Sequence, residues 1–513
     1  MLILPRAPGT AYAETWEVPP VHRPIPPPQP ESAPDESITN STSKYRTSKL
    51  HYLIPTTTIK PAVCAHLASA LLNRYSVPTI VGYKGKGEFD AHKAHIAKLK
   101  TAARYLHNVP DAQDDDLVII VDGFDVIAQM PAEATIQLYF DMMAVANQRV
   151  ADQHGLSLKE ARAEGLYQSL LWGTDKGCFP SKKLQPQCWI TPDPPSPHNV
   201  WGPRTGNGEL QYSPSKFLNS GTVIGPLGDL RNFLDAANEY IAENHEKVDS
   251  HRNSDQLYIS KLYARQEFHR TMQTLSKGQE YPGLNDRSDG RRELPPKRMV
   301  DEETEYHITV DFESAFAQTQ CHNDRFMWKL KYNNWDNSAH MKHDALDEGD
   351  RFRSYHIPMP SYFFKAFARM WNAIDADFRP GTTARDWVRN LPLGTNVATR
   401  RIHAFYHNTC TKRYFIERFR EFWFFPHIDT LLKTAKQANR RGNPISAEPI
   451  DGRIWVDANK HPSGTADPEN YGGVFTDFAS ESYLSFREAC GESWEEIFKT
   501  KLPVWRDAPK TET

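Results

Sequence analysis

The sequence predicts an α/β protein with a mostly parallel central sheet flanked by helices. The first observation behind this prediction is a run of five apolar residues at Leu117–Val121. Such a run, rich in β-branched side chains, is typical of a strand buried on both faces of a parallel sheet. The second observation is that patterns for strand, helix, strand, helix and strand follow one another across residues 49–126. Parallel strands joined by right-handed helical crossovers produce this alternation.

The composition is that of a globular, water-soluble protein with polar segments. The 513 residues carry a net charge of −3, with 24% charged and 39% hydrophobic residues. This charge provides no basic surface for nucleic acid, so we expect no nucleic-acid partner. No apolar stretch reaches the ~18 residues needed to span a bilayer. Pro5 comes too early for the apolar core of a secretory signal, which leaves cytoplasmic residence open. The oligomeric state is also left open.

Residues 1–47 hold most of a proline-rich run followed by Ser, Thr and Asn. This stretch cannot bury a core, and we expect a disordered stem or linker. It contains a glycosylation sequon at Asn40, which is usable only in the secretory pathway. Six cysteines in a chain of this length do not suggest a disulfide scaffold. Cys178 and Cys188 are close enough for a small disulfide loop, but two buried thiols are an equal alternative.

The elements before the central strand are two strands and two helices, expected at 49–58, 61–75, 78–83 and 90–107. The helix at 61–75 follows from its Ala and Leu content and its apolar spacing. The first strand ends in Pro55 and three threonines, and Thr56 at this exit suits either a nucleotide contact or a plain turn. The loop at 82–88 alternates glycine and lysine, so it could approach a diphosphate or simply be mobile.

Two aspartates follow the central strand at once, Asp122 and Asp125, with Phe124 between them. In open α/β sheets, ligands bind beyond the carboxyl ends of the strands, where this pair is expected. Two carboxylates there can hold a divalent cation, which in turn can hold a diphosphate. The alternative is that the carboxylates only cap the turn after the strand.

The second half of the chain continues the α/β pattern less regularly. We expect helices across 131–165, a helix beginning near Asp255, a closing helix within 413–435, and strand character at 166–178, 307–318 and 401–412. An aspartate at a helix start is usually an N-cap, which is the plain interpretation of Asp255. Two insertions are expected, a proline-rich loop at 180–215 and a polar irregular stretch at 320–395. The main domain is then 48–430, followed by a loop-rich extension at 431–513.

These stretches together resemble the glycosyltransferase domain of the collagen lysyl hydroxylases and related fungal-type proteins of the GT-A fold. The motifs that carry the resemblance keep their order along the chain: Gly85, Gly87 and Lys93; Asp122, Phe124 and Asp125; Asp175 before Cys178-Phe179-Pro180; Leu218-Asn219-Ser220-Gly221; Asp255-Gln256-Leu257; and His407 before Thr411-Lys412. The segment after His407 is one residue shorter than in the family, and Phe179 stands where the family usually has Trp. The stretch 320–395 is also far longer than the family's counterpart.

The resemblance implies a GT-A-type, Rossmann-like sheet and a role for each matched group of residues. It implies that Mn²⁺ binds to Asp122, Asp125 and His407. It implies nucleotide or phosphate contacts from Phe124, Lys93 and Lys412. Thr56, at the polar end of the first strand, is a further predicted nucleotide contact. It implies that the sugar or the acceptor faces Asp175, Asn219 and Asp255.

The expected function is therefore metal-dependent transfer of a hexose from a UDP-sugar to an unknown acceptor, with retention of configuration. Residence in the lumen of the Golgi or endoplasmic reticulum follows from the resemblance. One alternative is a non-catalytic carbohydrate-binding or scaffold protein on a decayed GT-A fold, which the shortened segment after His407 favours. A less favoured alternative is an Fe(II)/2-oxoglutarate oxygenase, because His322 and Asp324 form an H-x-D motif.

Overall fold

The computed structural model describes residues 45–197, 199–248, 250–276, 292–295, 303–333, 337, 355–379, 381–459 and 472–499. The expected stem at 1–47 therefore lies almost entirely outside the described residues, as does the Asn40 sequon. Parts of the insertion expected at 320–395 also lie outside them. Within these ranges, no helix combines the length and the apolar character that a bilayer crossing requires.

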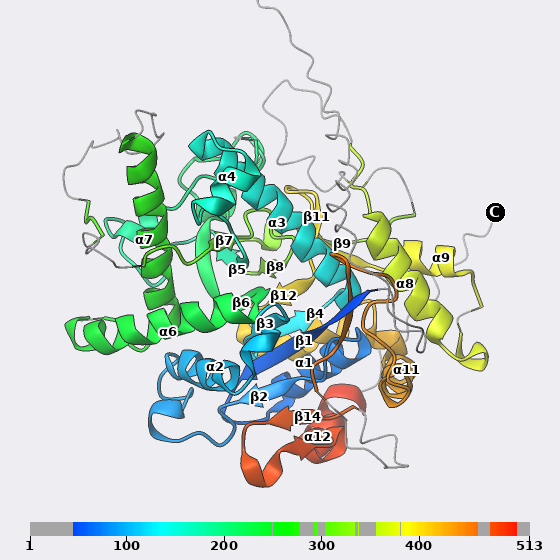
Figure 1. The fold of residues 1–513 in the computed structure, drawn as a ribbon. Helices are drawn as coiled ribbons and strands as arrows, with labels where there is room; N and C mark the ends of the chain where they lie inside the picture. The colour runs from blue at the N-terminus through cyan, green and yellow to red at the C-terminus, as the bar shows by residue number, and fades with distance from the viewer. Residues whose placement is uncertain are drawn as a thin grey trace, which may run out of the picture. The chain divides into compact units, whose positions relative to one another are not determined.

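The main sheet has 12 strands, and its order is β15-β14-β2-β1-β3-β6-β5-β8-β12-β4, with β13 beside β1 and β7 beside β5 (Figure 1). Its strands are β1 (Arg46–Pro55), β2 (Thr79–Val81), β3 (Leu117–Val121), β4 (Val126–Ala128), β5 (Leu170–Asp175), β6 (Phe217–Pro226), β7 (Ile308–Val310), β8 (Ala317–Thr319), β12 (Phe405–His407), β13 (Arg453–Asp457), β14 (Val474–Thr476) and β15 (Tyr483–Leu484). A second, antiparallel sheet contains β9 (Met327–Leu330), β10 (Leu393–Asn396) and β11 (Arg401–Ile402).

Most neighbours in the main sheet run parallel, which confirms the predicted α/β class with a mostly parallel sheet. β1 is parallel to β2, β3 and β13, and β8 is parallel to β5 and β12. β6 is antiparallel to both β3 and β5, and β4 is antiparallel to β12. The central strand β3 lies between β1 and β6, and its apolar side chains are buried or nearly so, as the run Leu117–Val121 predicts.

Helices cover both faces of the main sheet. They are α1 (Pro61–Leu72), α2 (Ala97–His107), α3 (Ala132–His154), α4 (Leu158–Ala163), α5 (Pro186–Trp189), α6 (Leu227–Asn244), α7 (Asp255–Ser276), α8 (Ser361–Ala373), α9 (Ala384–Asn390), α10 (Phe415–Arg420), α11 (Ile428–Arg440) and α12 (Phe486–Trp494). Because successive side chains of a strand point to opposite faces, β1 contributes to two cores. Tyr52 and Ile54 pack with α1 and α3, whereas Leu53 packs with α2, α6 and α7.

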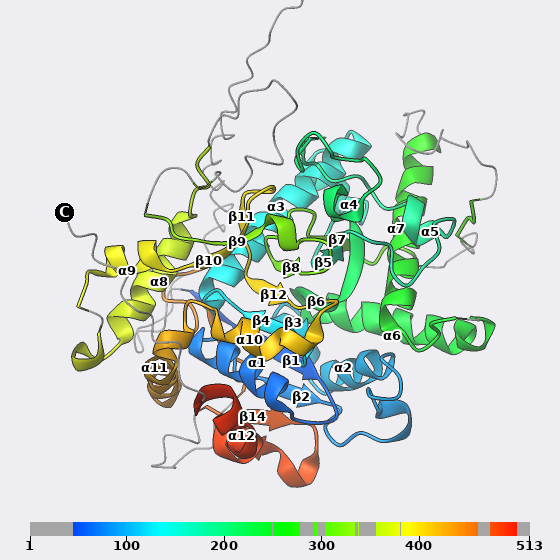
Figure 2. The ribbon, with the colours of Figure 1, turned by 180° about the vertical axis from the view of Figure 1, so that it is seen from behind.

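The chain beyond residue 430 differs from the loop-rich extension that we expected. β13 and β14 are parallel neighbours of β1 and β2, and α12 packs near α1. β14 and α12 lie beside β2 in both views, at the red end of the colour bar (Figures 1 and 2). The stretch 320–395 is likewise not purely irregular, since it contains β9, α8, α9 and β10. The sequence does not reveal β9, β10, β13 and β14, because strands of three to five residues are too short for a clear alternation of apolar and polar residues.

All six cysteines are paired, as Cys64–Cys490, Cys178–Cys188 and Cys321–Cys410. The expectation that the cysteines do not form a disulfide framework is therefore wrong, and the alternative left open for Cys178 is resolved as a disulfide. Two of the three bonds join residues 426 and 89 positions apart. Pairing over such distances leaves no spacing signature in the sequence, because connectivity depends on the fold.

Candidate metal and nucleotide site

The turn between β3 and β4 carries Asp122 and Asp125 at the carboxyl end of the central strand. The amide of Asp122 donates a hydrogen bond to the carbonyl of Gly221 on β6, at 2.9 Å. Gly123 allows the turn to pass close over β1, because a Cβ there would lie 2.9 Å from Cγ2 of Ile54. The turn is thereby fixed against both neighbouring strands, and the Asp125 side chain is buried.

His407 reaches this turn through strand pairing. β12 runs antiparallel to β4, which places His407 opposite Val126, the residue after Asp125. Its Nε2 lies 3.4 Å from Oδ2 of Asp125. The ring also lies against β6, where a Cβ on Gly221 would be only 2.2 Å from Cε1 of His407. Glycine at that position is what allows the imidazole to enter the site.

Among the described residues, one group of three His, Cys, Asp or Glu side chains has its ligand atoms within 4.8 Å of one another. This group consists of Asp122, Asp125 and His407. Oδ1 of Asp125 is buried and has no hydrogen-bond partner in the described part of the chain. A buried polar atom without a partner is costly, so a cation bound here would satisfy an oxygen that the protein leaves open. Two carboxylates and an imidazole suit a divalent transition metal such as Mn²⁺. These residues fit a divalent metal ion.

The three side chains also shift each other's protonation. Burial raises the pKa of Asp125, but the adjacent His407 and Lys412 outweigh burial and hold that pKa below its ordinary value. Burial lowers the pKa of His407, but the charge of Asp125 outweighs it and raises the pKa overall. The arrangement therefore favours a carboxylate at Asp125, the form that binds a cation.

Two lysines form ion pairs with the aspartates of the turn. Lys412 is one of the predicted lysines, and Lys98 is not. Lys412 forms an ion pair of 2.7 Å with Asp125. Lys98 on α2 bridges Asp122 and Asp255, at 2.8 and 2.9 Å. The predicted Lys93 is instead 76% exposed and lies 3.7 Å from Asp90, away from the two aspartates of the turn.

The difference between these lysines arises from where α2 begins. A helix was expected from residue 90, whereas residues 91–96 form turns and α2 begins at Ala97. From that start, Lys98 shares a helical stripe with the buried residues Ala102 and Leu106, at i+4 and i+8. This spacing is the signal in the sequence that could have identified Lys98.

A cavity of about 140 Å³ lies over the turn, lined by Thr56, Lys98, Phe124 and Lys412 among others. The Thr56 hydroxyl donates to the carbonyl of Thr58 at 2.9 Å, so it shapes the exit of β1. Phe124 is partly buried, with the ammonium of Lys60 5.7 Å from its ring centroid. The predicted nucleotide-binding residues Thr56, Phe124 and Lys412 therefore border one space, and Lys93 does not line it.

Asp175 and Asn219 form a second polar group at the ends of β5 and β6. The Asn219 amide donates to Oδ2 of Asp175 at 2.8 Å, and its carbonyl oxygen accepts from the amide of Gly221 at 2.9 Å. Gln256, which is part of the Asp255-Gln256-Leu257 motif but has no predicted role, joins them. Its amide lies 3.4 Å from the same Asp175 oxygen, and its carbonyl oxygen accepts from the amide of Ser220. Burial raises the pKa of Asp175, partly offset by Asn219 and by the nearby His407. Asp175 is thus electrostatically linked to the metal-ligand group.

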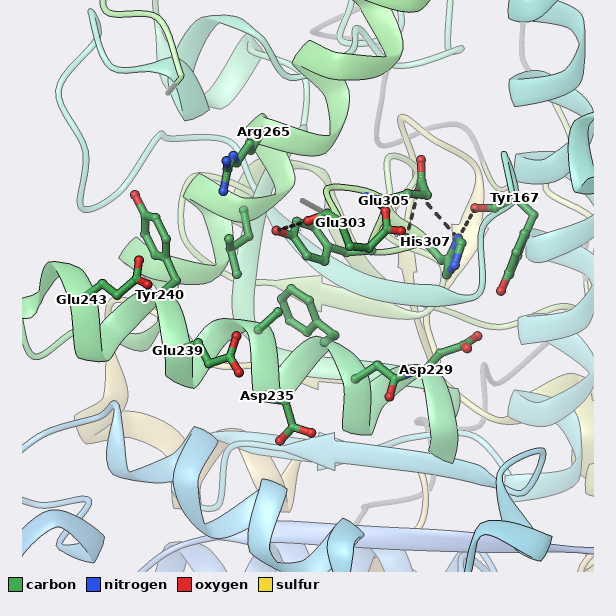
Figure 3. Close-up of a pocket in the computed structure, with 15 residues that line it drawn as sticks. Tyr167, Asp229, Asp235, Glu239, Tyr240, Glu243, Arg265, Glu303, Glu305 and His307 are labelled. Carbon is green, nitrogen blue, oxygen red and sulfur yellow. Dashed lines mark hydrogen bonds and ion pairs between the residues drawn. The ribbon is translucent and has the colours of Figure 1, made fainter. Parts of the chain in front are cut away.

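A wider cavity of about 590 Å³ lies away from these residues, between α6, α7 and residues 303–307 (Figure 3). Its lining is acidic, with Asp229, Asp235, Glu239, Glu243, Glu303 and Glu305. Figure 3 shows the carboxylates of α6 spread along the helix rather than directed at one point. None of the predicted site residues lines this cavity, and a spread of exposed acidic groups is typical of a solvated face.

The H-x-D motif does not form a comparable group within the described ranges. His322 is exposed, and both carboxylate oxygens of Asp324 accept from the Gln320 amide, at 2.9 and 2.8 Å. No protein-family model and no curated protein sequence matches the chain. The fold and the residues gathered at the carboxyl end of the sheet are therefore the features of the chain that bear on its function.

Proposed function

We propose that this protein is a metal-dependent glycosyltransferase of the GT-A type that transfers a hexose from a UDP-sugar to an acceptor. The observation that carries the proposal is the convergence of Asp122, Asp125 and His407 at the carboxyl end of a mostly parallel sheet. Open α/β sheets bind their ligands at that end. The unpartnered Oδ1 of Asp125 gives a cation a place there, and Nε2 of His407 lies 3.4 Å from the other oxygen of that carboxylate.

Different residues around the cavity would bind different parts of the nucleotide. Phe124 offers an aromatic face for the base, and Thr56 shapes the end of β1 beside it. Lys412 is 61% exposed, so its ammonium can leave Asp125 for a phosphate, whereas the buried Lys98 stays between its two carboxylates. A bound Mn²⁺ would stabilise the negative charge that develops on the departing diphosphate.

On the sugar side, Asp175 is the stronger candidate for stabilising a sugar that becomes cationic as the glycosidic bond breaks. Asp255 is neutralised by Lys98, while Oδ1 of Asp175 has no hydrogen-bond partner among the residues described. Asn219 holds the other oxygen of Asp175 and thereby fixes its direction. Retention of configuration is the stereochemical outcome that we propose for the transfer.

We also propose that the protein functions in an oxidising compartment, in agreement with a secretory-lumen location. The support is that every cysteine is in a disulfide, two of which link distant parts of the chain. Such bonds persist in secretory compartments and are rare in the cytosol.

A second candidate is a carbohydrate-binding or scaffold protein without catalysis. The observation that favours it is that each aspartate of the turn already has a lysine partner, Lys98 for Asp122 and Lys412 for Asp125. In this alternative the lysines replace the metal. It predicts sugar binding that is independent of Mn²⁺.

Isothermal titration of UDP, with and without Mn²⁺, tests the proposal on the wild type and on Asp125→Ala. We expect binding that requires Mn²⁺ and disappears in Asp125→Ala. Asp235→Ala is the control, because it removes a carboxylate from the wider acidic cavity. UDP binding that is unchanged when Mn²⁺ is omitted, and unchanged in Asp125→Ala, would contradict the metal-dependent mechanism. Once donor binding is established, screens of UDP-sugars and acceptors identify the substrates.

A further inference from the structure

The disulfide Cys321–Cys410 lies where two strands leave the sheet beside the metal-ligand group. β8 and β12 are parallel and in register, with Thr319 opposite His407. One residue later, the amide of Gln320 donates to the carbonyl of His407 at 2.9 Å. The disulfide then joins the two exits, and the amide of Cys321 donates to Oγ1 of Thr409 at 2.9 Å.

The segment that contains Cys410, residues 407–412, carries both His407 of the candidate metal site and Lys412, which pairs with Asp125. Its other edge is attached to the aspartate turn, because the amide of Asn408 donates to the carbonyl of Asp125 at 2.7 Å. The Asn408 side chain spans the segment by donating to the carbonyl of Thr411 at 3.1 Å. The segment is thus held between Asp125 on one side and Cys321 on the other.

Cys410 has a φ of +62°, in the left-handed region that residues with a Cβ rarely adopt. A non-glycine residue keeps such a conformation when its surroundings enforce it. Here the constraint is the bond to Cys321, together with the turn in which the amide of Thr411 donates to the carbonyl of Thr409 at 2.7 Å. This conformation directs the chain back so that Lys412 reaches Asp125.

We infer that the Cys321–Cys410 disulfide is a positioning device for the donor site: it holds His407 and Lys412 where the cation and the diphosphate bind. The inference rests on the proposed function. A preorganised segment loses less conformational freedom on binding, so affinity rises without any new contact. The other two disulfides lack this relation, since Cys64–Cys490 joins α1 to α12 and Cys178–Cys188 closes a loop after β5.

The test compares Cys321→Ser/Cys410→Ser with the matched variant Cys64→Ser/Cys490→Ser, which also lacks one long-range disulfide. Mn²⁺ affinity is measured from the electron paramagnetic resonance signal of free Mn²⁺, and UDP affinity by calorimetry. Circular dichroism and thermal unfolding report the fold. In Cys321→Ser/Cys410→Ser we expect Mn²⁺ affinity to fall by about tenfold or more, the effect typical of losing a support behind a metal ligand. UDP binding should return at high Mn²⁺ concentration.

The control variant should unfold at a lower temperature than the wild type but keep its Mn²⁺ affinity within about twofold. Equal losses of affinity in both variants would overturn the inference, because a general loss of stability would then explain them. Wild-type Mn²⁺ affinity in folded Cys321→Ser/Cys410→Ser would also overturn it. Absence of Mn²⁺ binding in the wild type itself would instead refute the proposed function, and this inference with it.

A second measurement keeps the test decisive if Cys321→Ser/Cys410→Ser does not fold. The folded wild-type protein is reduced without denaturant, its new thiols are alkylated, and peptide mapping identifies which disulfides have opened. Protein alkylated at Cys321 and Cys410 should bind Mn²⁺ about tenfold more weakly, whereas protein alkylated only at Cys64 and Cys490 should keep its affinity. Wild-type Mn²⁺ affinity in folded protein alkylated at Cys321 and Cys410 would overturn the inference.

Discussion

A methyl group at position 221 would lie 2.2 Å from Cε1 of His407 and 2.9 Å from its Nε2. Gly221→Ala should therefore displace the imidazole while leaving the strand β6 in place. We expect Mn²⁺ affinity to fall by roughly 10–100-fold, because the ligand geometry is disturbed and the ligand itself remains. Titration of Mn²⁺ with the resonance signal of the free ion measures this.

The control for this substitution is Gly381→Ala, since a Cβ at Gly381 has no described heavy atom within 4 Å. It should bind Mn²⁺ as the wild type does. Wild-type affinity in Gly221→Ala would show that His407 does not need its observed position to hold the cation.

Lys98 is 12% exposed and lies between Asp122 and Asp255. Lys98→Met leaves two carboxylates close together without their shared cation, so the free energy of unfolding should fall by about 3 kcal/mol. Added Mn²⁺ should restore part of this loss, because a cation bound only by the folded state stabilises it. Urea unfolding with and without Mn²⁺ measures both effects.

Lys93→Met is the matched control, because this lysine is 76% exposed. Its free energy of unfolding should change by less than about 0.5 kcal/mol. If the two variants were equally stable, the ion pairs of Lys98 would contribute nothing measurable to the fold.

His403 makes stability depend on pH. Burial, together with the nearby Lys329 ammonium, lowers the pKa of His403 to about 3. The unfolded chain takes up the proton near pH 6.5, so the unfolded state binds more protons as the pH falls and stability decreases. Between pH 7 and pH 5 this histidine should remove about 2 kcal/mol of stability, and the loss ends near pH 3, where both states are protonated.

His403→Leu has no proton to bind at this position, so its stability should fall less than that of the wild type over the same interval. Urea unfolding at pH 7, 6 and 5 gives the two slopes. The difference between the slopes isolates His403, because all other titrating groups are shared. Parallel slopes would show that folding does not change the pKa of His403.

At the scale of single residues, the sequence predicts Asp122, Asp125 and His407, which the structure brings together, better than it predicts the residues around them. Asp122 and Asp125 follow directly from a buried strand, and His407 from an ordered series of motifs. Lys98 is missed because its role depends on the first residue of α2, and helix boundaries are the least certain feature of a sequence. The role of Gln256 is not predicted, although the residue lies in a matched motif, because its contacts come from β5 and β6, which lie far from it along the chain.

At the scale of elements, the first strands and helices follow from local patterns, and the later strands do not. The βαβαβ series from β1 to β3 is recognisable because its helices are long and its central strand is apolar throughout. β4, β8 and β12 have three residues each, so periodicity cannot identify them. Yet the pairing of β12 with β4 is what brings His407 to Asp125, and this pairing is set by the fold as a whole.

The strand β13 supports the first half of β1, and its Trp455 is fully buried. The indole donates a hydrogen bond to the carbonyl of Ile450 at 3.1 Å. Trp455→Ala should lower the free energy of unfolding by roughly 3–5 kcal/mol, because it leaves a large cavity beside the main sheet. Denaturant unfolding measures the loss, and Trp328→Ala, at a tryptophan that is 42% exposed, is the control. Equal effects would mean that β13 is dispensable, as expected of a loop-rich extension.

At the scale of the whole molecule, disulfides tie together segments that the sequence shows as separate. Cys64 on α1 is bonded to Cys490 on α12, and Cys321 after β8 to Cys410 after β12. Both bonds cross the boundaries between the elements that local patterns identify. Six cysteines can pair in fifteen ways, and the sequence does not specify which of these pairings forms. The covalent framework therefore could not be predicted before the fold was known.

This framework predicts how thiol reagents act on the protein. Maleimide labelling in denaturant should find no free thiol before reduction and six after it, because all six cysteines are paired. Reduction should also lower the unfolding temperature, since bonds that close long loops restrict the unfolded chain most. The control is labelling of the same protein in denaturant after reduction, which sets the full signal. Two labelled thiols before reduction would show that one of the three bonds is absent, and peptide mapping would identify it. If that bond were Cys321–Cys410, the donor site would have to hold His407 without its covalent anchor.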